Sequence, residues 1–325
     1  MSSKPETWFI TGGAGYIGAH IADAFLLAGK NVVIYDSLYS GSVERIGYLE
    51  EKYKTHIPFV KGDICDKSAL NSALREKNIS GIVHLAALKS VEESSKNPDL
   101  YYDVNSEGTK NVVNSATTHS INKMIFSSTA AIYGIPAKDG ASQESDESQP
   151  ISPYGKTKLI AEEEVKKYLS IPGNHGTCLR YFNVIGTSSA YLVDNSKDNL
   201  IPIVIDALKN RRIIQVFGND YSTRDGTCIR DYVDVRDISR AHLLAAGTNA
   251  ELPPVINIGT GIGITVREVI NEICKVFKVT SPSIQSSKRR AGDPDSLCAD
   301  INLAKSQLQY APNFTFTESI ESLHF

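Results

Sequence analysis

At 325 residues, the chain is long enough for about two domains of ordinary size. Hydrophobic residues make up 41%, charged residues 22%, and the net charge is −3, so the basic excess typical of nucleic-acid-binding proteins is missing. Residues 1–7 are polar and unlike a signal peptide, no apolar run approaches the about 18 residues of a membrane span, and the five cysteines include no CxxC pair. We therefore expect no nucleic-acid partner, no membrane attachment, no metal site, and a reducing, cytoplasmic location.

The first half of the chain alternates short apolar runs with helical stretches. The runs cover residues 8–10, 32–35, 57–60, 82–85, 124–126 and 178–181. Between the first two, Ile17, Ile21, Phe25 and Ala28 form one apolar stripe of a helix that ends at Gly29. This alternation predicts an α/β fold: a Rossmann-type doubly wound parallel sheet with helices on both faces.

The pattern loosens after residue 181, which indicates a second domain. Residues 186–199 form a polar connection, beyond which strands are harder to predict. The run "PVINIGTG" at 254–261 follows the helical stretch 238–246 and predicts a return to the first sheet. We assign residues 1–182 plus about 232–261 to the Rossmann domain. Residues from about 183 to 231, plus 262–325, form a smaller mixed α/β domain that binds the substrate.

A glycine-rich stretch, "WFITGGAGYIGAH", joins the first run to the first helix. Gly12, Gly15 and Gly18 allow a tight turn, close approach of a diphosphate to the backbone, and close packing of helix and strand. The helix N-terminus adds free amides and a partial positive charge. Asp36, 18 residues after Gly18, can accept hydrogen bonds from an adenosine ribose and repel a 2′-phosphate, which favours NAD over NADP. Asp63, after the third run, either reaches the adenine or caps the next helix.

The stretch "SPYGKTK" predicts an acid–base pair on a helix. Ser152 can cap that helix and Pro153 can occupy its first position, so that Tyr154 and Lys158 share a face. A phenol with pKa ~10 is a poor base at neutral pH, and a nearby ammonium favours its ionised form. The spacing alone also fits an exposed tyrosine on an ordinary helix. Hydroxyl partners follow the fifth run at the carboxyl edge of the sheet, where ligands of open α/β sheets bind: Ser127, Ser128 and Thr129.

These motifs together resemble the extended short-chain dehydrogenase/reductase family, and specifically its UDP-glucose (UDP-galactose) 4-epimerases. The resemblance covers nearly the whole chain. It rests on "TGGAGYIG", "HLAALKSVEES", "SSTAAIYG", "YGKTK", "LRYFNVIG", "NLIP", "VFGNDYSTRDGTCIRDYVDVRD" and "RRAGDP", in the family's order. The last two are far more specific than a dinucleotide fingerprint.

The resemblance implies transient oxidation of a UDP-sugar. Tyr154 would take the proton of the 4-hydroxyl and NAD+ the hydride of C4; the 4-keto sugar would turn over, and hydride would return to its opposite face. Related dehydratases carry an Asp-Glu pair after the threonine, where this chain has Ala130 and Ala131, so elimination of water is not expected. Catalysis is therefore assigned to Tyr154, Lys158 and Thr129.

The resemblance also implies which residues bind the two ligands. For NAD they are Gly12, Gly15, Tyr16, Ile17, Gly18, Asp36, Ser37, Leu38, Tyr39, Ser40, Gly41, Asp63, Ile64, Leu85, Ala86, Ala87, Lys89, Asn105, Ser127, Tyr154, Lys158 and Phe182. For the UDP-sugar they are Thr129, Asn183, Asn199, Leu200, Gln215, Val216, Phe217, Arg230, Arg290, Asp293 and Leu297. Arg230 and Arg290 would bind the diphosphate, because a guanidinium suits its geometry, and Asp293 the uridine ribose.

Several alternatives stay open. Departures from the family pattern at Tyr39, Ser40, Ala87, Val184 and Ile185 concern cofactor retention and the choice of sugar, not the chemistry. At position 297 the family excludes N-acetyl sugars with tyrosine and admits them with small residues, so that leucine leaves UDP-glucose/UDP-galactose, a UDP-N-acetylhexosamine, a UDP-pentose or a UDP-uronic acid as candidate substrates. A protein of this fold could also sense NAD(H) without catalysis. The family further implies a homodimer formed through two helices of the first domain.

Overall fold

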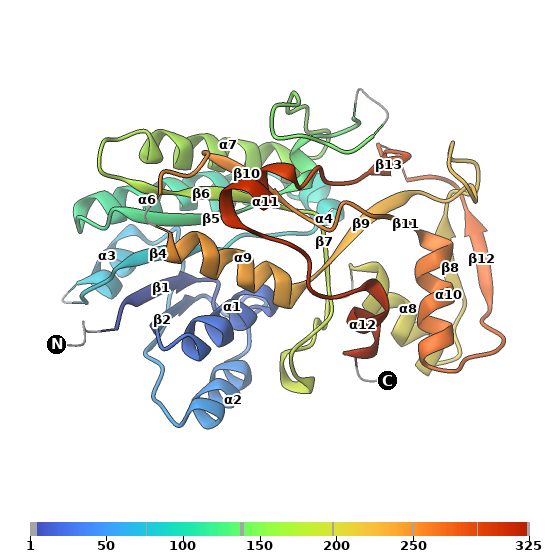
Figure 1. Ribbon diagram of the computed structural model, residues 1–325, viewed down its shortest axis with the longest axis horizontal. Helices are drawn as coiled ribbons and strands as arrows, with labels where there is room; N and C mark the ends of the chain where they lie inside the picture. Colours follow the sequence, from blue (N-terminus) through green and yellow to red (C-terminus); the bar gives the residue numbers. More distant parts are fainter. Residues whose placement is uncertain are drawn as a thin grey trace.

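A parallel sheet of seven strands forms the larger part of the molecule (Figure 1). The computed structural model describes residues 5–75, 77–136, 140–196, 198–248, 250–290 and 292–323. The strand order is β10-β6-β5-β4-β1-β2-β3. The strands are β1 (Thr7–Thr11), β2 (Asn31–Asp36), β3 (Phe59–Lys61), β4 (Gly81–His84), β5 (Lys123–Thr129), β6 (His175–Tyr181) and β10 (Val255–Ile258).

The predicted runs form this sheet, and the Rossmann-type architecture is confirmed. The third run is shifted, because Ile57 is buried just before β3 begins at Phe59. The run at 254–261 returns as predicted: β10 pairs in parallel with β6, Ile258 opposite Tyr181. Chain order reverses between β1 and β4, which are neighbours, so their carboxyl ends form the switch point where such sheets bind ligands.

Helices cover both faces of the sheet. On one face lie α1 (Tyr16–Leu27), α2 (Val43–Tyr53) and α9 (Val235–Gly247), and on the other α3 (Lys67–Leu74), α6 (Gly108–Thr118) and α7 (Pro153–Leu169) (Figure 1). The apolar stripe of α1 packs against the sheet as predicted, with Ile21 and Phe25 fully buried. Gly29 follows the helix at φ +72°, the left-handed conformation that glycine adopts most easily.

Short helical segments flank the carboxyl edge of the sheet. After β4 come α4 (Val91–Lys96), α5 (Pro98–Tyr101) and a π-helical turn, η1 (Tyr102–Glu107), which leads into α6. After β5 comes a single 3₁₀ turn, η2 (Ala130–Ile132), and η3 (Ala190–Leu192) interrupts the connection beyond β6. π-helical turns are rare and often occur at functional sites.

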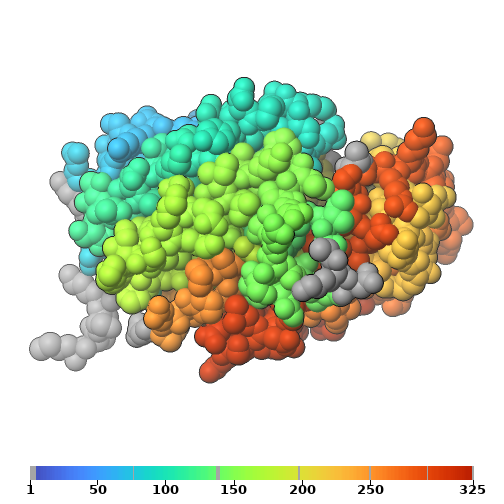
Figure 2. Space-filling view, turned by 90° about the horizontal axis from the view of Figure 1, so that it is seen from above, coloured from blue at the N-terminus to red at the C-terminus, as the bar shows by residue number. Residues whose placement is uncertain are grey.

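The second part of the chain contains smaller sheets. One consists of β7 (Asn183–Ile185), β9 (Ile229–Asp234), β11 (Gly263–Thr265) and β13 (Ser296–Leu297), and the other of the parallel pair β8 (Ile214–Phe217) and β12 (Ile284–Ser287). A separate apolar cluster joins α8 (Leu200–Lys209), α10 (Val266–Val276) and α12 (Phe316–Glu321), whereas α11 (Asn302–Leu308) packs with α9 on the main sheet. In Figure 2 most of the yellow to red residues gather at one end and along one edge of the molecule. The division into domains stays a prediction.

The buried carboxylate of Asp231 connects segments of the main sheet and of the smaller sheets. Asp231 of β9 has no exposed surface and accepts hydrogen bonds from the backbone amides of Thr260 (2.9 Å), Gly261 (2.9 Å) and Ala299 (3.2 Å). These amides follow β10 and β13, so three distant segments meet at one side chain. In the part of the chain that the structure describes, no helix is both long and apolar enough to cross a membrane.

Candidate active site

The glycines of the turn between β1 and α1 differ in how closely the rest of the protein packs against them. A Cβ on Gly12 would lie 2.8 Å from the amide nitrogen of Ala86, and one on Gly18 would lie 2.1 Å from the carbonyl oxygen of Gly12. These two glycines are therefore required by packing within the protein. A Cβ on Gly15 would meet only the Gly12 oxygen, at 3.2 Å, and Gly15 stands at the N-terminus of α1. The free amides of a helix N-terminus fit a dinucleotide diphosphate.

Asp36 shapes the loop beside this turn. Its Oδ2 accepts a hydrogen bond from the amide of Ala14 (3.0 Å) and its Oδ1 from the amide of Leu38 (2.8 Å). Burial raises the pKa of Asp36, and these amides oppose the shift. A Cβ on Gly41 would lie 2.9 Å from Oδ1, so the loop closes tightly around the carboxylate. Because a carboxylate can accept about four hydrogen bonds, the predicted contact with a ribose remains compatible with this arrangement.

The remaining residues of the predicted loop differ in exposure. Ser37, Leu38, Tyr39 and Ser40 continue from β2; Tyr39 is 66% exposed, and its hydroxyl donates to Glu93 (2.9 Å).

Asp63 does not cap the following helix. Its Oδ1 accepts a hydrogen bond from the amide of Cys65 (2.9 Å), whereas Asp66 caps α3 by accepting from the amides of Ser68 and Ala69. The capping alternative for Asp63 is therefore wrong. Its contact with an adenine stays a prediction, as does that of the neighbouring Ile64, which is buried.

The loop after β4 is held in place from two sides. The amides of Leu85 and Ala86 donate to Oγ1 of Thr11 (3.2 and 3.3 Å). Asn105, in the π-helical turn, accepts from the amide of Leu88 (2.8 Å) and donates to the Leu88 carbonyl (3.0 Å) and to Oγ1 of Thr157 (3.1 Å). Both amide hydrogens of Asn105 are thus engaged within the protein. Asn105 positions the loop that contains Ala87 and Lys89, and its predicted direct contact with NAD stays untested.

The helix that carries the predicted acid–base pair begins as expected. Oγ of Ser152 accepts from the amide of Gly155 (3.0 Å), and Pro153 is the first residue of α7. Burial raises the pKa of Tyr154, and a hydrogen bond with the side chain of Thr129 opposes this shift. The structure therefore brings Tyr154 and Thr129 together, at the end of β5.

Lys158 is buried on the same helix, and its predicted effect on the Tyr154 phenol stays a prediction. Its ammonium lies 4.1 Å from the centre of the Phe126 ring, and burial lowers its pKa to about 7. The side chain is packed against the sheet and is only 3% exposed.

Only one of the three predicted hydroxyls faces Tyr154. Ser127 forms a hydrogen bond with the phenol of Tyr181, which also contacts Nε2 of His242. Ser128 donates to Glu162 (2.7 Å). Thr129 remains as the hydroxyl beside Tyr154, in agreement with the predicted assignment.

A buried ion pair behind these residues was missed in the sequence. Glu162 accepts from Nη2 (2.6 Å) and Nε (3.0 Å) of Arg180, and the side chains are 0% and 4% exposed. Nη1 of Arg180 donates to the hydroxyl of Tyr133 (2.9 Å), which in turn donates to Asn257 (2.7 Å). The network joins α7, β5, β6 and β10 behind the residues predicted to be catalytic. A signal was available, because Tyr154, Lys158 and Glu162 are spaced four residues apart on one helical face.

The predicted diphosphate and ribose residues lie together at one end of the molecule. Nη2 of Arg230 donates to Asp293 (2.8 Å), and Nη1 donates to the carbonyl of Pro294 (2.9 Å). The guanidinium of Arg290 lies over the ring of Phe217, 4.2 Å from its centre. Leu297 faces Arg230 across the ladder of β13 and β9, and joins an apolar cluster with Ala130 and Phe182.

Other predicted substrate residues are placed differently. Along β8, Gln215 and Phe217 are exposed and Val216 is buried, so Val216 can offer a ligand only its backbone. Asn183 is exposed at the start of β7. Asn199 stands before Leu200, the first residue of α8, and its Nδ2 donates to Asp194 (2.5 Å).

Comparisons with known proteins agree with this geometry. A family model described as GDP-mannose 4,6 dehydratase matches residues 9–323. The UDP-glucose 4-epimerase of Rhizobium meliloti (strain 1021) is 38% identical over 96% of this chain and 94% of its own length. The UDP-glucose 4-epimerase of Stenotrophomonas maltophila, crystallised with bound NAD and formylated UDP-arabinopyranose, matches with a TM-score of 0.91 and 32% identity, over 98% of this chain and 96% of that one. The UDP-Glc/GlcNAc 4-epimerase of Campylobacter jejuni matches with a TM-score of 0.84 and 34% identity, over 98% and 97%.

The chain belongs to the UDP-glucose 4-epimerase family.

The site separates epimerase from dehydratase chemistry, which matters because the matching family model has a dehydratase description. Where the resemblance places an acid pair in dehydratases, Ala130 is buried and the amide of Ala131 donates to Oγ1 of Thr129 (3.2 Å). Among the described residues, no carboxylate shifts the pKa of Tyr154. An elimination needs a second acid and base at this place. The local chemistry agrees with the epimerase family.

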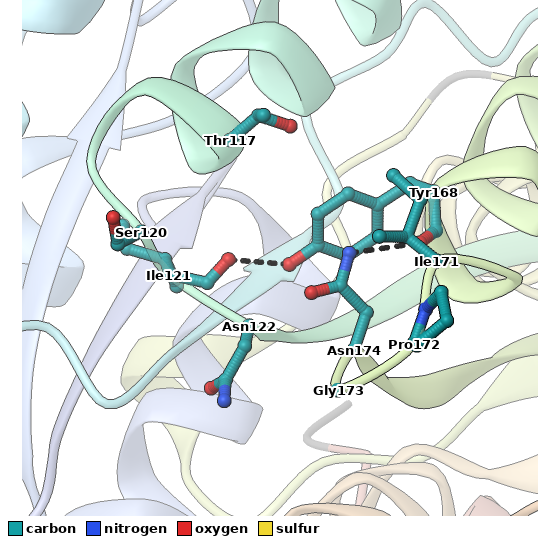
Figure 3. A pocket seen from close by; sticks show the side chains of 9 residues that line it. All are labelled: Thr117, Ser120, Ile121, Asn122, Tyr168, Ile171, Pro172, Gly173 and Asn174. Atoms are coloured by element: carbon teal, nitrogen blue, oxygen red, sulfur yellow. Dashed lines mark hydrogen bonds between the residues drawn. The ribbon is translucent and has the colours of Figure 1, made fainter.

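A separate cavity lies away from this site. It measures about 330 Å³, and Figure 3 shows its lining from the ends of α6 and α7 and the loops that follow them, including Tyr168, whose hydroxyl donates to the carbonyl of Ile121. These loops precede β5 and β6, at the edge of the sheet opposite the site, and none of the predicted site residues lines the cavity.

Proposed function

We propose that this protein interconverts UDP-sugars that differ in configuration at C4, with UDP-glucose and UDP-galactose as the first pair to test. The observation that carries the proposal is Tyr154 beside Thr129 at the carboxyl edge of the sheet, with alanines where a dehydratase needs its acids. This site can remove a proton from a sugar hydroxyl and return it, but it lacks the groups for elimination.

The cofactor we propose is NAD, held by the glycine turn and the loop around Asp36. The position of Gly15 at the N-terminus of α1 supports this, as does the NAD in the Stenotrophomonas relative. When bound, NAD supplies a hydride acceptor at C4 that later becomes the donor. Lys158, whose pKa is lowered to about 7, can exchange a proton at neutral pH and would be held in its charged form by ribose oxygens.

Each catalytic residue then has a proposed task. Tyr154 accepts the proton of the 4-hydroxyl and returns it after the sugar has turned over. The hydroxyl of Thr129 supports the ionised phenol and orients the sugar oxygen. Arg230, Arg290 and Asp293 hold the UDP group, so that the sugar can turn while its diphosphate stays bound.

A second candidate is a 4-epimerase for another UDP-sugar, such as an N-acetylhexosamine, a pentose or a uronic acid. Leu297 favours keeping this candidate, because it lies beside Phe182 and Ala130 in the apolar cluster near the site and is smaller than tyrosine. The match to a UDP-Glc/GlcNAc 4-epimerase also supports it.

The decisive experiment is incubation of the purified protein with separate UDP-hexoses, UDP-N-acetylhexosamines and UDP-pentoses, without added NAD and then with it. Proton NMR would detect the C4 epimers. We expect conversion by the native protein and loss of about 10²–10⁴-fold in Tyr154→Phe, the usual contribution of general acid–base catalysis, with NAD still bound. Unchanged turnover in Tyr154→Phe would refute the mechanism. NAD binding without conversion of any UDP-sugar would favour the NAD(H)-sensing alternative.

We also propose a homodimer and a reducing, cytoplasmic location. Helices α6 and α7 pack side by side in the first part of the chain (Figures 1 and 2), and we propose this pair as the helical interface that the family implies. All five cysteines are free, four of them buried, as expected of a protein that lives in a reducing compartment. Light scattering of the purified protein would give its mass in solution. A mass equal to that of a single chain would refute the proposed homodimer.

A further inference from the structure

The connection beyond β7 crosses the edge of the sheet that carries the site. We call residues 186–196 the strap. The hydroxyl of Tyr16, the first residue of α1, donates to the carbonyl of Gly186 (2.6 Å), and the amide of Ser188 donates to Nε2 of His20 (3.0 Å). The strap is therefore fastened along α1, directly after the glycine turn.

Arg45 ties the strap to the glycine turn itself. It is 7% exposed and lies on α2, outside every residue set predicted for the site. Its Nη1 donates to the carbonyl of Ala14 (3.2 Å) in the turn, and its Nη2 donates to the carbonyl of Val193 (2.9 Å) in the strap. One guanidinium thus spans two segments that are far apart in the sequence.

The far end of the strap reaches the other ligand-binding loops. Asp194 accepts from Nδ2 of Asn199 (2.5 Å), the residue before α8, and its Oδ1 lies 3.9 Å from Nζ of Lys89 in the loop after β4. The strap consequently contacts segments that follow β1 and β4, the two neighbouring strands at the switch point of the sheet. It crosses the place where this fold binds its nucleotide.

The charges around Arg45 agree with a lasting bridge, formed by its guanidinium, between the glycine turn and the strap. Burial lowers the pKa of Arg45, and the nearby carboxylates of Asp194 and Asp36 oppose this shift. An arginine side chain stays protonated in proteins, so the bridge keeps both of its donors at any ordinary pH. A lysine has a single nitrogen at its end and cannot reproduce the planar fork that reaches two carbonyls.

We propose that Arg45 is a positioning residue that holds the strap against the glycine turn and thereby slows the exchange of NAD. The inference rests on the proposed binding of NAD at this turn. When the bridge is lost, the strap opens more often, and release of the cofactor becomes faster without slower association. A hydrogen bond to a charged group corresponds to roughly 10- to 100-fold in such an opening equilibrium.

The test measures cofactor exchange directly, apart from catalysis. Full-length protein would be loaded with NADH, and release would be followed by the loss of NADH fluorescence after mixing with excess NAD+. The variants are Arg45→Met, which removes both donors, and Arg45→Lys, which keeps the charge. The control is Glu51→Gln on the same helix, because Glu51 is exposed and belongs to none of the contacts described for the strap.

We expect release to accelerate about 10-fold or more in Arg45→Met and clearly in Arg45→Lys, with native association rates and with native release in Glu51→Gln. Native release in Arg45→Lys would show that charge alone matters and would overturn the bridge, as would slower association in place of faster release. Should Arg45→Met fail to fold, Arg45→Lys decides the question. The protein could also bind and exchange NADH as expected and yet epimerise no UDP-sugar. That result would refute the proposed catalysis but would still support the role of Arg45.

Discussion

The change Glu162→Gln is expected to destabilise the protein strongly, because it leaves a buried guanidinium without its counter-charge. Glu162 and Arg180 are 0% and 4% exposed and share two hydrogen bonds. Removal of one partner of such a pair typically costs about 3–5 kcal/mol. The loss is a large share of the roughly 5–15 kcal/mol that stabilises a typical domain. Urea unfolding at neutral pH, followed by circular dichroism, would measure the change in the free energy of unfolding.

Two further variants make this prediction specific. Glu163→Gln alters the next residue of the helix, whose ion pair with Lys166 is 49% and 33% exposed, and it should cost less than about 1 kcal/mol. The double change Glu162→Leu with Arg180→Met removes the whole pair and should recover most of the loss, since apolar replacements of buried pairs are often neutral or stabilising. Equal effects of the changes at 162 and 163 would refute the reasoning.

Three more predictions concern the site. In the cofactor-free protein, the pKa of Lys158 is about 7 against its ordinary value of 10.5, so the unfolded chain binds the extra proton between these values and stability should rise with pH across this window. Urea unfolding should show about 2 kcal/mol more gain between pH 7 and pH 9 in the native chain than in Lys158→Met, and equal gains would contradict the burial of the ammonium. Gly15→Ala should keep native stability but weaken NAD binding, whereas Gly18→Ala should unfold more easily, because its Cβ would lie 2.1 Å from a carbonyl oxygen. Calorimetric titration would measure NAD binding by the two variants, and thermal melting would measure their stability. Tight NAD binding by Gly15→Ala would contradict binding of the diphosphate at the glycine turn. Leu297→Tyr should reduce conversion of UDP-N-acetylhexosamines more than of UDP-glucose, and an equal loss on both substrates in the NMR assay would remove Leu297 from the sugar pocket.

The sequence predicts the main sheet well because its strands are buried on both faces. Such strands are continuous apolar runs that need no partner to be recognised, and glycines mark their ends. The small sheets were harder to predict, since β13 has two residues and the exposed side chains of β8 alternate with buried ones. Their pairing depends on contacts between segments far apart in the chain, which no local pattern records.

The residues of the candidate site could also be predicted only in part. Ser152, Tyr154 and Thr129 belong to local motifs whose chemistry is visible in the sequence, and the structure brings Tyr154 and Thr129 together. Arg45 and Glu162 were missed because both sit among charged residues on helices, where a solvent-exposed role is the usual outcome. Only the folded chain distinguishes the buried Glu162 from its exposed neighbours and shows the ammonium of Lys158 packed over the ring of Phe126.

The carboxylate of Asp231 has a consequence for protein engineering. Asp231 lies in β9 and accepts hydrogen bonds from amides of the segments after β10 and β13. The segments predicted to bind the UDP-sugar therefore cannot be removed as one continuous piece of the chain. A transplant of substrate preference from a relative would have to exchange several separate stretches at once and keep this carboxylate at their junction. Single substitutions inside the existing frame are therefore the shorter route to a new specificity.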